Sequence, residues 1–281
     1  MKTFYTRSIS AIIFGIIMLG GILWGETSFF ILFLIIALGC IREYFKLVEN
    51  IDPGYLQVSS WHRPCVYLLV VAVFFLLSGT HFQIVYIPAE FLGLWGGFML
   101  IIIIFINEGL FMDRLHYRNL WYSLLGLIYI ALPLGLMVSL RWNYSWNHIA
   151  VIPLGIVLCI WINDTMAYIV GSLIGKTKFF PSISPNKTWE GTMGGIILTI
   201  MAGAIYGLFG HTYTLLDWIV IAAIASISGT AGDLLESKIK RLAGVKDSGN
   251  LMPGHGGFLD RFDSLIVATV FVWLYAAFLI K

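Results

Sequence analysis

Long runs of apolar residues, separated by short polar breaks, occupy this chain from end to end. Most runs approach the roughly 20 residues that a helix needs to cross a ~30 Å hydrocarbon core. In lipid such runs must be helical, because every backbone polar group needs an internal partner. The second run reaches that length only if it continues through Tyr44 and Phe45. The pattern predicts an all-α integral membrane protein with about nine transmembrane helices. The nine runs are about 8–25, 28–41, 64–80, 88–107, 119–140, 148–175, 191–210, 214–236 and 264–280.

The composition and the distribution of charge agree with this interpretation. Of the 281 residues, 59% are hydrophobic and 11% are charged, against about 25% charged residues in soluble domains. If the N-terminus is cytoplasmic and nine helices alternate, cytoplasmic segments hold 15 of the 17 lysines and arginines, all except Arg141 and Lys281. This bias sets membrane topology, so it predicts a cytoplasmic N-terminus. No small-x-small cleavage site follows the first run, which we therefore expect to be a retained helix.

The polar residues that resist a structural explanation lie in the second half of the chain. We therefore expect residues 1–147 to form N-terminal scaffold helices and residues 148–281 to form a catalytic region. Its cytoplasmic loops are expected over 176–190 and 233–263. The net charge is only +2, and no nucleic-acid partner is expected.

Asp164 is the only charged residue between Ala150 and Gly175. Fourteen residues precede it in that run, which corresponds to about 21 Å of helix. A carboxylate at that depth costs on the order of 3 kcal/mol and usually faces a cavity or a partner. We favour a functional role over the alternative, a structural hydrogen bond to a neighbouring helix.

Two pairs of acids flank the last long loop. Asp233 and Glu236 share a helix face at a C-terminal end, where like charges repel and the macrodipole disfavours anions. Neither capping nor a salt bridge explains this pair well, whereas a bound cation would. Asp260 and Asp263 form the second pair, and Asp263 is also a plausible N-cap before Ser264. Together the pairs predict a carboxylate cluster, whose hard oxygen ligands suit Mg²⁺.

Basic residues accompany these acids. They suit the oxygens of a polyphosphate, although the positive-inside bias alone can explain any one of them. Pro181 and Pro185 exclude a helix from the other loop, which adds a further lysine. His255, alone, is more typical of a hydrogen-bonding loop residue. The combination predicts metal-assisted phosphoryl or nucleotidyl transfer on a lipid. The basic residues are Lys238, Lys240, Arg241, Lys246 and, from the other loop, Lys187.

The segment "SKIKRLAGVKDSGNLMPGHGGFLDRFD", residues 237–263, resembles the signature of the phosphatidate cytidylyltransferases. "PSISPNKTWEGTMGG" and "GDLLESKIKR" resemble the same family, so the resemblance covers about 160 to 264. It implies that the phosphate of phosphatidate attacks the α-phosphorus of CTP, giving CDP-diacylglycerol and pyrophosphate. Ser172 departs from the family pattern, which often has Arg there.

The resemblance also implies roles for individual residues. Mg²⁺ ligands would be Asp233 and Asp260, with a potassium ion beside the magnesium. The expected catalytic residues are Asp233, Asp260, Lys238, Arg261 and Asp263. The expected substrate-binding residues are Lys187, Lys240, Arg241, Lys246, His255, Asp164 and Glu236. A homodimer is expected on the same ground. The lysine and arginine distribution, in contrast, predicts that the site faces the cytoplasm, and the short chain with its simple topology predicts the inner (plasma) membrane.

Two other functions fit part of the pattern. A CTP-dependent lipid kinase would use the same nucleotide but transfer the γ-phosphate to an alcohol. A proton-coupled secondary transporter could use Asp164 as a relay, yet transporters often show matched interruptions in two halves. Here the polar positions cluster in one half, which favours the cytidylyltransferase.

Overall fold

The computed structural model describes residues 2–84, 86–111, 117–144, 150–210, 212–250 and 256–280. Nine continuous helical segments lie within these ranges, one for each predicted apolar run. Seven are long and apolar enough to cross a membrane, and Ser10–Leu23 and His62–Leu77 are shorter apolar helices. The segments are α1 (Lys2–Leu23), α2 (Glu26–Ile51), α3 (His62–Leu77), α4 (Ala89–Phe111), α5 (Tyr117–Gly126) continuing through η3 (Leu127–Ala131) into α6 (Leu132–Asn143), α7 (Val151–Ile174), α8 (Trp189–Phe209), α9 (Leu215–Leu242) and α10 (Leu259–Leu279).

Two short antiparallel hairpins add strands that the all-α prediction did not include. One joins β1 (Gln83–Ile84) to β2 (Ile87–Pro88), and the other joins β3 (Lys178–Phe180) to β4 (Ser184–Thr188). The second hairpin lies in the connection predicted over 176–190, where prolines exclude a helix. Two short 3₁₀ helices, η1 (Pro53–Gln57) and η2 (Gly79–His81), are the other regular elements of the described ranges.

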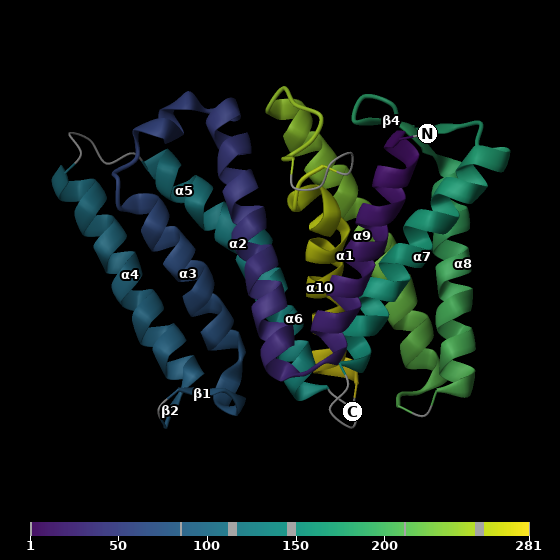
Figure 1. Ribbon diagram of the computed structural model, residues 1–281, viewed down its shortest axis with the longest axis horizontal. Coiled ribbons are helices and arrows are strands. Elements are labelled where there is room, and N and C mark those ends of the chain that lie inside the picture. The colour runs from purple at the N-terminus through teal and green to yellow at the C-terminus, as the bar shows by residue number, and fades with distance from the viewer. Residues whose placement is uncertain are drawn as a thin grey trace.

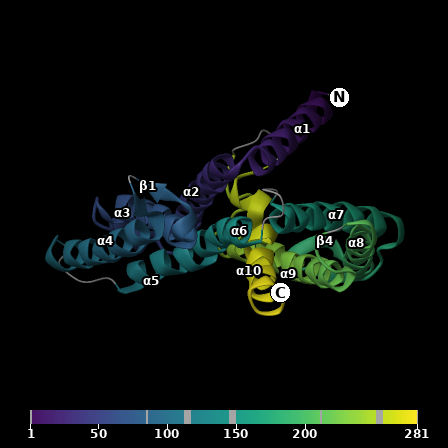
Figure 2. The same cartoon turned by 90° about the horizontal axis from the view of Figure 1, so that it is seen from below.

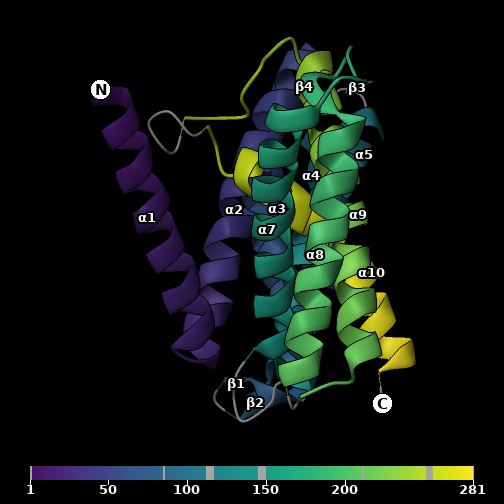
Figure 3. The same ribbon diagram turned by 90° about the vertical axis from the view of Figure 1, so that its right-hand side faces the viewer.

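The helices run up and down in alternation. Figure 1 shows the N-terminus, the hairpin β3–β4 and the α9–α10 connection at one end, with the C-terminus at the other. In cross-section α3 and α4 lie at one extreme, α7 and α8 at the other, and α10 between them (Figure 2). Helix α1 leans away from the rest (Figure 3). The alternation is the one that the lysine and arginine distribution requires, and the cytoplasmic orientation stays a prediction.

Helix α9 is longer than predicted. It continues through Lys240 and Arg241, so its connection to α10 is 243–258 rather than the expected 233–263. Lysine and arginine are good helix formers, and their charge is favoured near a helix C-terminus. The basic residues therefore extend the helix instead of ending it.

Asp263 is not an N-cap, contrary to the sequence prediction. Helix α10 begins at Leu259, which puts Asp263 in its second turn, where Oδ1 accepts the backbone N–H of Ser264 at 2.6 Å. The acid in the first turn is Asp260, where the macrodipole favours a negative charge.

Packing joins the two ends of the chain around α10. This helix lies along α9 and α6 and also contacts α2, and buried residues of all four belong to one apolar core. The start of α9 is fixed by a capping box between Thr214 and Asp217, which satisfies backbone donors at that end. The N-terminal helices thus support the helices that carry the predicted acids, and the division at residue 147 stays a prediction.

Candidate active site

A polar pocket of about 410 Å³ lies between α7, α8, α9 and strand β4. Asp164 of α7, Lys187 of β4 and Asp233 of α9 all line it, and the Asp164 side chain is exposed to it. The Lys187 ammonium forms an ion pair with Oδ2 of Asp233. Three site residues predicted from separate segments are therefore brought together. Ser172 also lines this pocket.

Close helix packing and a few polar contacts build the pocket. A Cβ at Gly191 would lie 2.7 Å from a backbone oxygen of α7, so glycine lets α8 approach closely. Asn163 donates to the Thr230 hydroxyl at 3.3 Å and links α7 to α9. At the base of the hairpin, the Glu190 carboxylate accepts the backbone N–H of Thr177 at 3.1 Å. These contacts hold the hairpin lysine over the pocket.

A second cluster surrounds Lys240, near the end of α9. Its ammonium lies 2.5 Å from Oε2 of Glu236 and 2.6 Å from Oδ1 of Asp260. The other oxygen of Asp260 accepts the backbone N–H and the hydroxyl of Ser248, both at 3.0 Å, and the N–H of Gly257 at 2.7 Å. Asp260 therefore ties both ends of the α9–α10 connection to α9.

The inference that salt bridges do not explain Asp233 and Glu236 is wrong. Each acid has a lysine partner, Lys187 for Asp233 and Lys240 for Glu236. Lys187 comes from a distant hairpin, so helical spacing gave no sign of it. The i, i+3 repulsion is offset by two cations from different elements.

Asp263 lies among the other acids and is almost fully buried. Its carboxylate interacts electrostatically with Asp233, Glu236 and Asp164. In the described part of the chain, Oε1 of Glu236 is buried without a hydrogen-bond partner. Buried carboxylates of like charge are stabilised by a cation, and an all-oxygen donor set suits Mg²⁺.

The donor chemistry therefore fits Mg²⁺, although the described residues form no ready-made metal site. Among the described side chains, no three acids, histidines or cysteines are grouped so that they could hold an ion. Asp260 already accepts four hydrogen bonds, and Asp233 is paired with Lys187. The assignment of Asp233 and Asp260 to the metal stays a prediction.

The remaining predicted cations lie around this site. Lys238 and Lys246 are exposed. Arg241 donates to one backbone carbonyl of the hairpin at 3.4 Å and to one of the α9–α10 connection at 3.2 Å, so it joins two loops. Arg261 is exposed at the start of α10 and interacts electrostatically with Asp164. His255 lies outside the residues that the structure describes.

Glu43 of α2 is part of this site, and sequence reasoning missed it. Its carboxylate is buried, and Oε2 accepts the Ser248 hydroxyl at 2.7 Å and the backbone N–H of Leu259 at 2.9 Å. Oε1 accepts the backbone N–H of Phe258 at 2.9 Å. An acid from the predicted scaffold thus holds both the α9–α10 connection and the first turn of α10.

Two glycines of the signature segment make room for this carboxylate. A Cβ at Gly249 or at Gly257 would overlap the Glu43 oxygens. A usable sequence signal existed, since Cys40, Glu43 and Leu47 share one face of a helix and all three are buried. The predicted apolar run 28–41 ended before Glu43, and the sequence prediction gave this residue no role.

Comparison with known proteins identifies similar sequences. The model of the family described as "Cytidylyltransferase family" matches residues 5–279. A phosphatidate cytidylyltransferase of Staphylococcus haemolyticus is 50% identical over 111 residues, 39% of this chain and 42% of that protein. Proteins of the same name from Staphylococcus saprophyticus and Bacillus subtilis are 38% and 40% identical, over 55% and 54% of this chain and 58% and 56% of theirs. The chain thus spans about half the length of the curated relatives it matches.

Proposed function

The chain belongs to the cytidylyltransferase family, and we propose that it transfers CMP from CTP to phosphatidate, giving CDP-diacylglycerol and pyrophosphate. The relatives named phosphatidate cytidylyltransferase support this reaction. The observation that carries it is the convergence of Asp164, Lys187 and Asp233 on one pocket. That pocket lies within a bundle of membrane-spanning helices, where a lipid phosphate and a nucleotide triphosphate can meet.

The chemistry is one displacement at phosphorus. An oxygen of the lipid phosphate forms a bond to the α-phosphorus of CTP, and the bond from that phosphorus to the oxygen bridging to the β-phosphate breaks. The electron pair of the broken bond leaves with pyrophosphate. An ionised phosphate needs no base, and no covalent protein intermediate is required. The site must therefore hold two anionic groups together and neutralise the charge of the transition state.

Lysines and arginines of the site perform most of that task. Lys187, held over the pocket by strand β4, exchanges its Asp233 partner for a phosphate oxygen. Charge-assisted hydrogen bonds of this kind are the strong ones in phosphate recognition. Around it we assign the triphosphate and the lipid phosphate to Lys238, Lys246, Arg241 and Arg261, with Lys240 orienting Asp260. His255 is kept as a further phosphate ligand.

Asp233 and Asp260 are the residues that would hold Mg²⁺, with Asp263 and Glu236 beside them and K⁺ as a second cation. When bound, the metal supplies positive charge to the phosphoryl oxygens. Asp164 lines the pocket and orients the basic groups. We further propose that the site faces the cytoplasm, on the inner (plasma) membrane, and that the chain forms a homodimer.

Labelled CTP separates the candidate reactions. The purified protein in detergent is incubated with phosphatidate, Mg²⁺ and CTP labelled at either the α- or the γ-phosphate. The reaction predicts α-label in the lipid, lost in Asp233→Asn and Asp260→Asn. Asp217→Asn, at the opposite end of α9, is the control that retains transfer. Transfer of γ-label would instead indicate a lipid kinase. If the folded protein transferred neither label, the enzyme proposal would be refuted and a secondary transporter would become the favoured function.

A further inference from the structure

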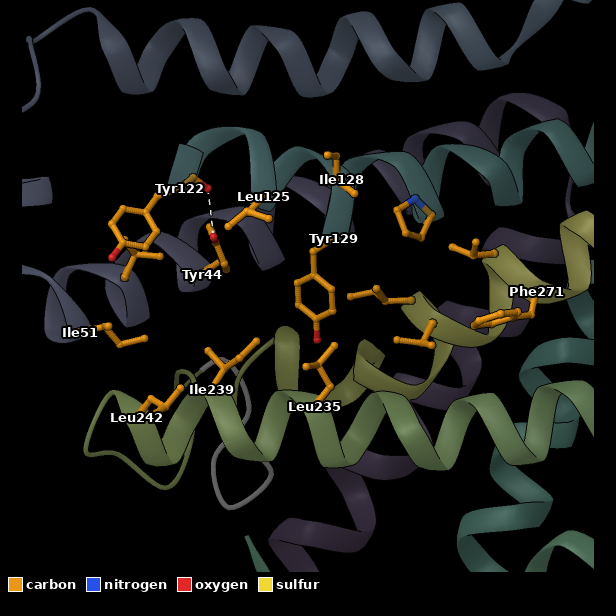
Figure 4. Close-up of a pocket in the computed structure, with 15 residues that line it drawn as sticks. Tyr44, Ile51, Tyr122, Leu125, Ile128, Tyr129, Leu235, Ile239, Leu242 and Phe271 are labelled. Carbon is orange, nitrogen blue, oxygen red and sulfur yellow. Dashed lines mark hydrogen bonds between the residues drawn. The ribbon is translucent and has the colours of Figure 1, made fainter. Parts of the chain in front are cut away.

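A second, apolar pocket of about 580 Å³ lies between the N-terminal and C-terminal helices. Its walls come from α2, α5 and η3 on one side and from α9 and α10 on the other (Figure 4). Ile128 and Phe271 line it and are 51% and 50% exposed. Because these residues belong to membrane-spanning helices, the pocket opens sideways into the hydrocarbon. Its volume is within the roughly 300–1,000 Å³ of small-molecule sites.

This pocket begins one helical turn from the acids of the candidate active site. On α10, Ile266 and Val270 line it and lie about 4.5 and 10 Å along the helix axis from Asp263. On α9, Leu235 lines it and is the immediate neighbour of Glu236. The same two helices thus carry carboxylates toward the polar site and apolar side chains toward the lipid.

A buried hydroxyl marks the junction of the two regions. Tyr129 extends from η3 across the pocket toward α9, and its hydroxyl lies beside Leu235 (Figure 4). Among the described residues this hydroxyl is buried without a hydrogen-bond partner, and it interacts electrostatically with Asp263 and Glu236. Tyr44, by contrast, donates to the carbonyl of Tyr122 at 3.0 Å. A buried hydroxyl without a partner carries a desolvation cost that a bound acceptor removes.

The backbone at this point also departs from regular structure. Residues 127–131 form a π-helical turn inside an otherwise α-helical segment. Such turns are uncommon and occur frequently at functional sites. Here the turn carries both Ile128, at the rim of the pocket, and Tyr129, whose hydroxyl lies beside Leu235 (Figure 4).

We infer that this pocket binds the acyl chains of the diacylglycerol phospholipid substrate, with the Tyr129 hydroxyl donating to an ester or phosphate oxygen of the lipid. The inference rests on the proposed function, because it places the lipid phosphate at the neighbouring acids. The chains enter from the bilayer between η3 and α10. The head group then extends past Asp263 toward the pocket lined by Asp164, Lys187 and Asp233, where the displacement takes place.

A lipid tail suits this pocket better than a second copy of the chain. A protein partner would leave the Tyr129 hydroxyl facing further apolar side chains, whereas a glycerolipid brings ester and phosphate acceptors on the same molecule as its tails. The position one turn from the site also fits a substrate whose reactive phosphate is attached to two apolar chains.

Photo-crosslinking of the wild-type protein tests the inference without turnover. A phosphatidate with a diazirine in one acyl chain is reconstituted with the protein in the absence of CTP, irradiated, and the labelled peptides are identified by mass spectrometry. Labels are expected on α5, η3 and the pocket-facing positions of α9 and α10. Labels confined to the outer faces of α4 and α8 would overturn it.

A matched pair of substitutions supplies the kinetic test. Ile128→Trp fills the rim of the pocket, while Ile197→Trp adds the same bulk on α8 at a position with equal exposure, 52% against 51%. Overpacking an apolar site shifts an equilibrium by about tenfold or more, so Ile128→Trp raises KM for phosphatidate by about that factor and leaves KM for CTP unchanged. Tyr129→Phe raises KM for phosphatidate without removing any volume-filling group. Ile197→Trp changes neither constant.

The outcomes separate the two proposals. If the wild-type protein transfers no CMP but is labelled in the pocket, the proposed function is refuted and the lipid site stands. If the wild-type protein transfers CMP but both pocket variants keep the wild-type KM for phosphatidate, only the lipid site is refuted. An altered oligomer mass for Ile128→Trp, without labelling of the pocket by the lipid, would assign this surface to a second copy and refute the inference.

Discussion

Replacing Glu43 by glutamine is expected to loosen the α9–α10 connection and to slow CMP transfer. The substitution keeps the size of the side chain but removes its charge and replaces one acceptor oxygen by a donor. In the structure the two oxygens of Glu43 accept three hydrogen bonds, from Ser248, Phe258 and Leu259. An amide can keep its oxygen toward Ser248 and Leu259, and its NH₂ group then faces the N–H of Phe258.

The size of the effect follows from these contacts. Hydrogen bonds to a charged group contribute about 1.5–3 kcal/mol each and neutral ones about 0.5–1.5 kcal/mol, and a buried donor left unsatisfied costs about 1–3 kcal/mol. Lower desolvation of the neutral amide offsets part of this loss. The net free-energy cost to the ordered α9–α10 connection is about 3 kcal/mol, which corresponds to a decrease of about a hundredfold in kcat.

Two measurements check this expectation in the same preparation. The first is kcat for transfer of α-labelled CMP to phosphatidate. The second is hydrogen exchange of backbone amides in 244–250 and 256–259, which reports opening of the connection directly. Glu43→Gln should lower kcat and speed exchange in this segment, while exchange in α3 and α8 stays at the wild-type rate.

Glu49→Gln is the matched control on the same helix. Glu49 forms an ion pair with Arg63 at 2.5 Å, with both side chains partly exposed, and such pairs contribute about 0–1 kcal/mol. It should leave kcat within a few-fold of wild type. Wild-type kcat and exchange in Glu43→Gln would refute the positioning role, and faster exchange throughout the helices would mean general destabilisation instead.

Three further expectations follow from the same site. Lys187→Met should lower CMP transfer by more than tenfold through loss of a charge-assisted contact, whereas Lys178→Met in the same hairpin, scored in the same assay, should not. Gly249→Ala should lower CMP transfer because its Cβ overlaps the Glu43 carboxylate. Gly96→Ala, where nothing lies within 4 Å, should leave transfer and thermal stability at or above wild type. Equal transfer by the two variants would contradict the close contact at Gly249. Chelation by EDTA should abolish transfer and added Mg²⁺ should restore it, and full activity after exhaustive chelation would exclude the metal.

The sequence by itself determined the class of the protein, and it predicted the three charged residues that line the candidate site. The nine predicted apolar runs correspond one to one to helical segments of the described residues, seven of them long enough to span a membrane, because a chain in lipid must satisfy its backbone hydrogen bonds within each segment. Asp164 was identified by its depth in one run, and Lys187 and Asp233 by the chemistry of neighbouring segments. All three lie on one pocket, since alternation of the helices returns their connections to the same end of the bundle.

Only the tertiary structure decided how the acids are held. The lysine partner of Asp233, the contact between Lys240 and Asp260, and the role of Glu43 depend on contacts between elements. The pair of Glu236 and Lys240, by contrast, lies four positions apart within α9. Glu43 and Phe258 are 215 positions apart, and no local pattern links them. Periodicity reports which face of a helix is buried, but the donors that meet a buried carboxylate are set by packing. A buried charge must be paired or hydrogen-bonded, and in this protein its partners come from segments that only folding brings together.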